Sequence, residues 1–204
     1  MSVKKLFIAR HGETDYNKQG LLQGRGIDAP LNETGWDQAR KLAGYLQQYP
    51  TDHLVSSSLK RSWQTAEPFR DSTGLDIRKD EGLDEMDFGI YEGVPYTEAV
   101  GDLVALKEIW ESGNIDEPVP GGESPLQVFE RANGAVRKIM DQSSEETIVL
   151  ILHGRLIRIL LSEWLGYGLE NMQQVSHQNG AVNHLVYNGE FEAVYLNKIE
   201  HLAV

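Results

Sequence analysis

Two short runs of uninterrupted apolar residues are the strongest pattern in the chain. The first lies within residues 3–9, as Leu6 to Ala9, and the second spans Thr147 to Leu152. Strands that are buried on both faces of a parallel sheet have this continuous apolar character. We therefore predict two central parallel strands, with a shorter strand at His53 to Ser56 and an edge strand around Ile77.

Apolar positions elsewhere recur at helical spacing, and each such segment carries a start or stop residue. Asn32 is a suitable N-cap for one helix, and Gly74 follows a second helix predicted from about Ser58 to Ser72. Ser124-Pro125-Leu126-Gln127 has the capping-box pattern with proline at the first helical position. The predicted apolar faces are Trp36, Ala39, Leu42, Ala43 and Leu46; Leu103, Leu106, Ile109 and Trp110; and Leu126, Phe129, Ala132, Val136 and Ile139.

The carboxyl-terminal third begins with a helix that follows residue 154, runs through Leu165 and ends at Gly166. A hairpin comes next, because Asn188-Gly189 separates apolar segments at 182–187 and 191–196. Residues 82–95, rich in glycine, acids and aromatics, predict an ordered loop. Strands that alternate with helices indicate an α/β domain of three layers, with a mostly parallel mixed central sheet flanked by helices.

Both central strands end in a histidine followed by a glycine. Arg10-His11-Gly12 follows the first strand and His153-Gly154 follows the second. In open α/β sheets, ligands bind beyond the carboxyl ends of the strands, so both histidines should emerge at the ligand-binding edge. The glycines allow the backbone to turn and a ligand to approach closely. Without further information, two unrelated strand-end histidines are the competing interpretation.

Composition narrows the classes of function. The chain has 204 residues, no cysteine and a net charge of −12. Thiol chemistry is excluded, and the acidic balance argues against nucleic acid as a partner. It does not argue against a small anionic ligand, because a few arginines can reverse the field inside a pocket. The amino-terminal apolar run is too short for a signal peptide and no segment is long enough to span a membrane, so we expect a cytoplasmic protein without a membrane partner.

The order of short motifs resembles the histidine phosphatase superfamily, in the branch that contains phosphoglycerate mutases and broad-specificity phosphatases. The matching pieces are Arg10-His11-Gly12-Glu13-Thr14 with Asn17, Gln23-Gly24, Leu31 with Gly35 and Gln38-Ala39, Ser56-Ser57 with Leu59-Lys60-Arg61 and Gln64-Thr65-Ala66, Glu85 with Phe88-Gly89 and Glu92-Gly93, Gly121-Gly122-Glu123-Ser124, and His153-Gly154. The resemblance implies a phosphoglycerate mutase-like fold. Residues 1–204 would form one domain, with a small helical cap inserted at about 95–122.

The resemblance also assigns roles that suit the chemistry of the residues. His11 would be the nucleophile, since a neutral imidazole is nucleophilic near pH 7 while its other nitrogen donates to a nearby carbonyl. Arg10 and Arg61 would grip the phosphoryl oxygens with their planar guanidinium groups. His153 would hydrogen-bond the transferring group. The substrate-binding set is Arg10, Asn17, Gln23, Gly24, Arg61, His153 and Gly154.

Phosphoryl transfer depends mainly on positioning and charge stabilisation, so these donors could replace a metal ion. We therefore expect no metal and no cofactor. Glu85 would protonate the leaving oxygen and later activate water, and a neighbouring phosphate favours its protonated form. The competing acids, interpreted as solvated loop residues, are Glu81, Asp84, Asp87 and Glu92.

Several other polar residues carry weaker expectations. Glu13 could orient an arginine or have only a structural role, and Thr14 and Ser57 could contact phosphate or cap turns, with capping favoured. No role is assigned to Arg155. His53, His177, His184 and His201 are interpreted as ordinary polar residues.

The cap distinguishes the candidate activities. A mutase must enclose its intermediate, and the segment from Tyr96 to Gly122 is short, which favours a metal-independent phosphatase acting on a small phosphate ester. The alternatives are a cofactor-dependent phosphoglycerate mutase and an inactive phosphate-binding relative. Tyr96, Leu103, Leu106 and Trp110 could contact substrate or could be ordinary packing. A homodimer is the assembly that we consider.

Overall fold

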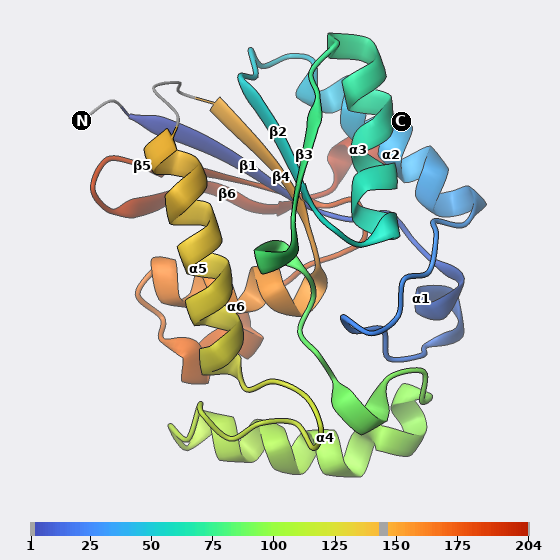
Figure 1. The fold of residues 1–204 in the computed structure, drawn as a ribbon, viewed down its shortest axis with the longest axis vertical. Helices are drawn as coiled ribbons and strands as arrows, with labels where there is room; N and C mark the ends of the chain where they lie inside the picture. The colour runs from blue at the N-terminus through green and yellow to red at the C-terminus, as the bar shows by residue number, and fades with distance from the viewer. Residues whose placement is uncertain (1–2, 143–146, 204) are drawn as a thin grey trace.

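The computed structural model describes residues 3–142 and 147–203. Six strands form one mixed sheet in the order β3-β2-β4-β1-β5-β6. The parallel part consists of β1 (Lys4–Arg10), β2 (His53–Ser57), β3 (Ile77–Asp80) and β4 (Thr147–Leu152). An antiparallel hairpin, β5 (Val182–Tyr187) and β6 (Phe191–Lys198), completes the sheet beside β1. The predicted three-layer α/β fold with a mostly parallel mixed sheet is confirmed (Figure 1).

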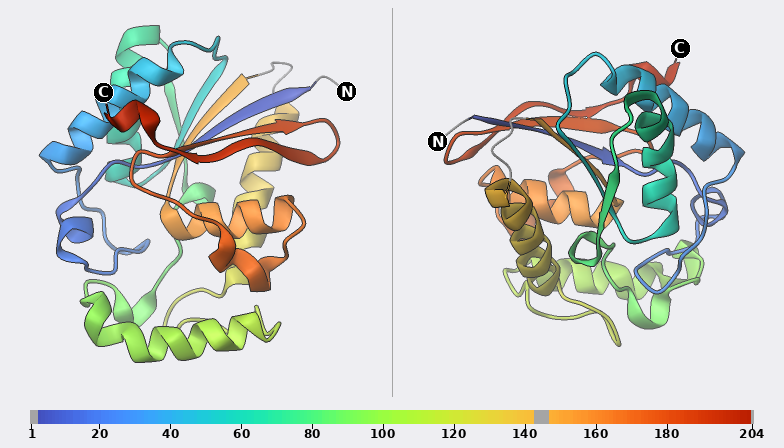
Figure 2. Two further views of the ribbon diagram at one scale, coloured as in Figure 1. Left: turned by 180° about the vertical axis from the view of Figure 1, so that it is seen from behind. Right: turned by 45° about the horizontal axis from the view of Figure 1, so that its top comes forward.

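Helices cover both faces of the sheet. On one face lie α2 (Glu33–Leu46) and α3 (Lys60–Thr73), and on the other lie α5 (Pro125–Gln142) and α6 (Gly154–Trp164). The right-hand view of Figure 2 shows the sheet between these pairs. None of the helices within the described ranges is both long and apolar enough to cross a membrane.

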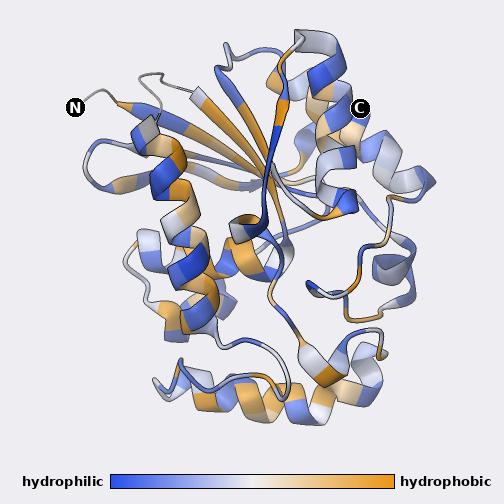
Figure 3. Cartoon of the chain, in the orientation of Figure 1, coloured by the Kyte–Doolittle hydropathy of each residue, from blue (hydrophilic) through white to orange (hydrophobic). Residues whose placement is uncertain are grey.

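The central strands contain continuous apolar runs, at 6–9 in β1 and 148–152 in β4, because both of their faces are buried there. Phe7 and Ala9 point into the cluster beneath α2 and α3, whereas Leu6 and Ile8 join the cluster beneath α5 and α6. Figure 3 shows hydrophobic colour along the central part of the sheet, beside helices of alternating character. All four side chains have no exposed surface, which is the physical reason for the pattern in the sequence.

The helix caps follow the sequence closely. The Asn32 side chain accepts from the backbone N–H of Gly35, and Gly74 adopts the left-handed conformation that ends α3. Ser124 and Gln127 exchange reciprocal capping hydrogen bonds at the start of α5. The predicted start of α3 was two residues early, because Leu59 is the N-cap and Lys60 the first helical residue.

Helix α4 (Tyr96–Glu111) stands apart from the sheet at the foot of Figure 1. Its buried residues are Ala99, Leu106 and Trp110, whereas Ile109, predicted to be on the apolar face, is 36% exposed. Short helical segments that the sequence did not predict are α1 (Asp15–Gln19), η1 (Glu81–Leu83), η2 (Gly89–Tyr91), η3 (Leu169–Gln174) and η4 (Glu200–Ala203). The loop preceding α4 pairs with the α1 region, since Leu22 and Tyr96 donate to the carbonyls of Val94 and Gly20, respectively.

Candidate active site

The two strand-end histidines lie together because their strands are neighbours. Arg10 of β1 is paired in register with Leu152 of β4, so His11 and His153 follow at the same edge. Their ring centroids are 5.2 Å apart. Both side chains are almost fully buried, with exposed fractions of 3% and 0%. The sheet topology therefore places the two histidines as the sequence predicted.

The ring of His11 is fixed in one orientation. Its Nδ1 lies 2.7 Å from the carbonyl oxygen of Gly12. A carbonyl can only accept, so Nδ1 carries the proton and Nε2 keeps its lone pair. Burial and the neighbouring Arg61 and Arg10 cations hold the pKa of His11 well below its usual value. The imidazole is therefore neutral at physiological pH, with Nε2 available as a nucleophile.

The peptide of Gly12 sits in a space that only glycine can occupy. A Cβ at Gly12 would collide with the carbonyl oxygen of Gly35, and a Cβ at Gly35 would collide with that of Glu13. The Gly12 N–H donates to the Thr65 hydroxyl over 2.9 Å. This close approach of two glycines sets the position of the carbonyl that orients His11.

The ring of His153 is oriented by Ser57, which ends β2 beside β4. Ser57 Oγ lies 2.6 Å from His153 Nε2 and accepts from the Leu59 N–H over 3.2 Å. A hydroxyl can accept from Leu59 and donate to Nε2 at the same time, and in that arrangement the imidazole proton of His153 is on Nδ1. That nitrogen is buried without a partner. Burial and Arg61 hold the pKa of His153 well below normal, so this ring is also neutral.

Unpartnered donors surround the histidines. Buried nitrogens that have no hydrogen-bond partner include Nε of Arg10, Nε of Arg61 and Nε2 of Gln23. Arg61 is fully buried, and its other nitrogens donate to the carbonyls of Ile27 and Gly24. An unsatisfied buried donor costs about 1–3 kcal/mol, so a group of them indicates a place where an anion binds. We call Arg10, His11, Arg61 and His153 the phosphoryl site.

Burial lowers the pKa of both Arg10 and Arg61 to about 10, with Glu85 acting in the opposite direction. Both guanidinium groups therefore stay charged at neutral pH.

Glu85 lies at the amino end of α6. Its Oε1 accepts from the backbone N–H groups of Met86 and Leu156, each over 2.9 Å, and its Oε2 accepts from the Arg155 N–H over 3.0 Å. Glu85 is 5% exposed and borders the same hollow as His11. These backbone donors fix the position of the carboxyl group.

The competing acids are engaged elsewhere. Asp84 accepts from the Ser58 hydroxyl and backbone, and Glu92 accepts from the N–H groups of Gly26 and Phe88. Asp87 caps Gly89, and Glu81 lies at the exposed start of η1. The interpretation of Asp84 as a solvated loop acid is wrong, because its exposed fraction is 4%.

The hollow has a volume of about 370 Å³ and opens between α4, α6 and the α1 region. Asn17 and Gln23 line it. The side-chain oxygen Oε1 of Gln23 accepts from the Thr14 hydroxyl over 2.8 Å, which leaves the side-chain nitrogen Nε2 of Gln23 free. Of the cap residues proposed from sequence, Tyr96 lines the hollow, whereas Leu106 and Trp110 belong to the core and Leu103 packs against it. Thr14 caps α1, as expected.

Four polar residues that line this hollow were not predicted as site residues: Arg155, Arg158, Gln173 and His177. Together with Tyr96, we call them the outer wall. The His177 Nδ1 accepts from Arg10 Nη1 over 2.9 Å, and its ring lies against Gly154, where a Cβ would come within 2.6 Å of it. Burial, with Arg10, lowers the pKa of His177 to about 3. In the sequence, these residues look like ordinary polar residues of a helix or loop, because nothing there marks the contacts that they make in the fold.

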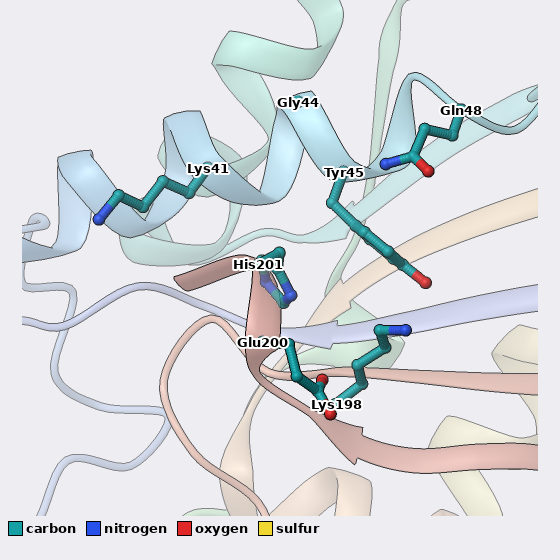
Figure 4. Close-up of a pocket in the computed structure, with 7 residues that line it drawn as sticks. All are labelled: Lys41, Gly44, Tyr45, Gln48, Lys198, Glu200 and His201. Carbon is teal, nitrogen blue, oxygen red and sulfur yellow. The ribbon is translucent and has the colours of Figure 1, made fainter. Parts of the chain in front are cut away.

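Glu13 and His201 have structural contacts. Glu13 accepts from the Asn32 side chain over 2.9 Å. His201 stacks on Tyr45, with ring centroids 5.1 Å apart, and lies 3.0 Å from the Gly180 carbonyl through Nε2. It borders a second hollow of about 530 Å³ between α2 and the carboxyl-terminal segment (Figure 4), lined by Lys41, Gly44, Tyr45, Gln48, Lys198, Glu200 and His201. Those residues are separate from the ones that line the phosphoryl hollow.

No group of three or more histidine, cysteine or acidic side chains within residues 3–142 and 147–203 is arranged to hold a metal ion. The polar groups of the phosphoryl site are instead cationic or neutral donors.

Comparison with known proteins identifies relatives along the whole chain. The sequence pattern of the histidine phosphatase superfamily (branch 1) matches residues 6–198. The chain is 32% identical over 203 residues to "Putative phosphoserine phosphatase 2" of Hydrogenobacter thermophilus, covering 98% of each protein. It is 29% identical over 187 residues to "Probable phosphoglycerate mutase GpmB" of Escherichia coli, covering 90% of this chain and 85% of the relative.

A solved structure has the same fold. The mycobacterial glucosyl-3-phosphoglycerate phosphatase in complex with VO3 superimposes with a TM-score of 0.86 and 27% identity, covering 96% of this chain and 100% of the other.

Proposed function

This chain belongs to the histidine phosphatase superfamily (branch 1), and from that premise we propose that it hydrolyses a small-molecule phosphate monoester through a phosphohistidine formed on His11. The observation that carries the proposal is the neutral, oriented His11 ring with unpartnered donors of Arg10, Arg61 and His153 around it. A phosphoryl group supplies the anionic acceptors that those donors lack.

The reaction has two steps. In the first, His11 Nε2 attacks phosphorus, the bond from phosphorus to the ester oxygen breaks, and Glu85 gives its proton to that oxygen. In the second, the Glu85 carboxylate takes a proton from water, the water oxygen attacks phosphorus, and the N–P bond breaks. Inorganic phosphate leaves and Glu85 is again protonated.

The phosphoryl oxygens are bound by the chain itself in both steps. In this mechanism the unpartnered donors of Arg10 and Arg61 and a proton on Nδ1 of His153 bind the transferring group, and Asn17, Gln23 and the backbone at Gly24 and Gly154 supply further donors. Because these donors stabilise the charge that develops on the oxygens, we propose that the reaction needs no metal ion.

The test is hydrolysis of p-nitrophenyl phosphate with EDTA present. We expect the wild-type protein to be active and His11→Ala to lose roughly a millionfold in kcat, as expected when a nucleophile is removed. His53→Asn is the matched control, because His53 begins β2 at the opposite edge of the sheet. Wild-type turnover by His11→Ala, or complete loss of wild-type activity with EDTA, would contradict the proposal.

A phosphoglycerate mutase activity is the second candidate, because a relative carries that name. The two activities share the phosphohistidine and differ in whether water or a second hydroxyl accepts the phosphoryl group. We favour hydrolysis because the cap between Tyr96 and Gly122 is short. The discriminating measurement compares release of free phosphate with interconversion of 2- and 3-phosphoglycerate; we expect phosphate release to dominate. A cytoplasmic location and a homodimer stay predictions.

A further inference from the structure

Two arginines of α6 line the outer wall at positions that the phosphoryl chemistry does not use. Arg155 and Arg158 are three residues apart, so their side chains leave the same face of the helix. The phosphoryl site already has two arginines of its own, Arg10 and Arg61. The pair on α6 therefore requires a separate explanation.

Each of the two guanidinium groups has a buried nitrogen without a hydrogen-bond partner. Nη1 of Arg155 and Nε of Arg158 are buried and make no hydrogen bond. In residues 3–142 and 147–203, neither side chain forms an ion pair with an acidic group. Burial and the nearby Arg158 cation lower the pKa of Arg155 to about 10, with Glu85 acting in the opposite direction, and burial lowers the pKa of Arg158. Two buried like charges that form no ion pair destabilise each other, so an anion bound between them would be stabilised.

The pair is held in place. Arg158 Nη1 donates to Oε1 of Gln173 over 2.6 Å. The Arg155 guanidinium lies 5.8 Å from the ring centroid of Trp110, which is itself fixed by a hydrogen bond from its Nε1 to the Glu117 carbonyl. These contacts from α4 and η3 orient donors toward the hollow rather than toward solvent. The chain thus has a prearranged pair of cations in the same hollow as Arg10 and His11.

We propose that Arg155 and Arg158 bind a second anionic group, a carboxylate or a second phosphate, on the leaving-group part of the substrate. This inference rests on the proposed phosphatase function and identifies its substrates as phosphate esters whose alcohol carries a negative charge. Arginine forks match both kinds of oxyanion, and the same hollow contains the nucleophile, so one small molecule can reach both sites.

The test uses pairs of esters that differ in the second charge. O-phosphoserine is compared with O-phosphoethanolamine, and 3-phosphoglycerate with glycerol 3-phosphate, for the carboxylate. Fructose 1,6-bisphosphate is compared with fructose 6-phosphate for the second phosphate. We expect wild-type kcat/KM to be about 10–100-fold higher for the charged member of at least one pair, as one charge-assisted contact allows.

Arg158→Gln should remove that preference. It should lower kcat/KM for the ester with the second charge about tenfold or more, through a higher KM, and leave kcat/KM for the ester without that charge nearly unchanged. Arg158→Lys should restore part of it. Arg155→Gln should act in the same direction, and thermal unfolding would show whether either variant still folds. The control is Arg40→Gln, an exposed arginine of α2. Equal hydrolysis of both members of every pair by the wild type, or equal losses on both in the variants, would overturn the inference.

Failure of the underlying function looks different. If the chain were not a phosphatase, neither p-nitrophenyl phosphate nor any ester would be hydrolysed, and His11→Ala would match the wild type. A binding measurement separates the two further: O-phosphoserine should raise the wild-type unfolding temperature more than O-phosphoethanolamine does, and Arg158→Gln should abolish the difference. Equal shifts for the two members of every ester pair, the fructose phosphates included, would contradict the second anion site even if catalysis were absent.

Discussion

The phosphoryl site, from which Arg10 and His11 line the hollow, and the outer wall of that hollow are built differently. The phosphoryl site is assembled from strand ends and the start of α3, and backbone groups such as the Gly12 carbonyl fix its side chains. The outer wall comes from α4, α6, η3 and the loop before β5, and other side chains position its members: Gln173 contacts Arg158, Trp110 contacts Arg155 and Arg10 contacts His177. The contrast suggests that the first region determines the reaction and the second determines which ester reacts.

The contrast makes a general prediction about variants. Changes in the phosphoryl site should reduce turnover of every ester alike. Changes in the outer wall should act unequally, according to the group that the leaving alcohol carries.

Arg61→Lys should lower kcat by roughly a thousandfold on all substrates, because lysine keeps the charge but loses the planar fork that grips a phosphoryl group. The measurement is steady-state kinetics on p-nitrophenyl phosphate and on an alkyl ester. Arg70→Lys is the control, on an exposed turn of the same helix. A loss confined to one substrate would place Arg61 in ester recognition instead.

Glu85→Gln should reduce kcat/KM for alkyl esters by about 10²–10⁴-fold, the range of general acid catalysis. The loss should be much smaller for p-nitrophenyl phosphate, because p-nitrophenolate leaves without a proton. Slow attack of water should also produce a burst of p-nitrophenol. Glu81→Gln is the matched control, on an exposed rival acid. Equal losses on the two esters would argue against a role as proton donor.

Gly154→Ala tests the boundary between the two regions. A Cβ there would lie 2.6 Å from the His177 ring, which accepts from Arg10. Moving the ring should displace the Arg10 guanidinium and cost roughly 10–100-fold in kcat/KM, as expected for a displacement of about 1 Å. Gly134→Ala in α5 is the control, because a Cβ there meets nothing within 4 Å. Unchanged kinetics in Gly154→Ala would show that His177 does not position Arg10.

The smallest expected effect concerns stability and is shared by both regions. His11, His153 and His177 have lowered pKa values in the folded protein, whereas unfolded histidine has a pKa near 6.5. Below about pH 6.5 the unfolded chain therefore binds more protons, and the free energy of unfolding falls by up to about 1.4 kcal/mol per pH unit for each histidine.

For His177 this loss continues until about pH 3. Urea unfolding between about pH 5 and 7 measures the slope, and His177→Gln should reduce it. A free energy of unfolding that rose on acidification over this range would contradict the lowered pKa values.

The sequence predicted the phosphoryl site far better than the outer wall. His11 and His153 could be placed because each ends an apolar strand, and strand ends meet at one edge of a parallel sheet. Arg61 and Glu85 required the family resemblance, and their catalytic roles stay predictions. Arg155, Arg158 and His177 have no such marker, because their proximity depends on how α6 and η3 pack.

The fold shows the same distinction. Elements with a core-facing pattern or a strong cap, such as β1 and α2, were predicted nearly to their ends. The five-residue α1 was missed because it buries no residue, although Thr14 and Asn17 form a capping box. The position of α4 relative to the sheet could not be predicted, since it depends on long-range pairing of residues 93–96 with 20–22.

The most direct test of the account is to trap the phosphorylated protein. The wild type and Glu85→Gln are mixed with substrate, quenched in alkali, where phosphohistidine survives, and digested for mass spectrometry. We expect one added phosphoryl group on the peptide that contains His11, in greater yield in Glu85→Gln, and none in His11→Ala. A phosphoryl group on another residue, or turnover by a protein that never carries one, would contradict the proposed mechanism.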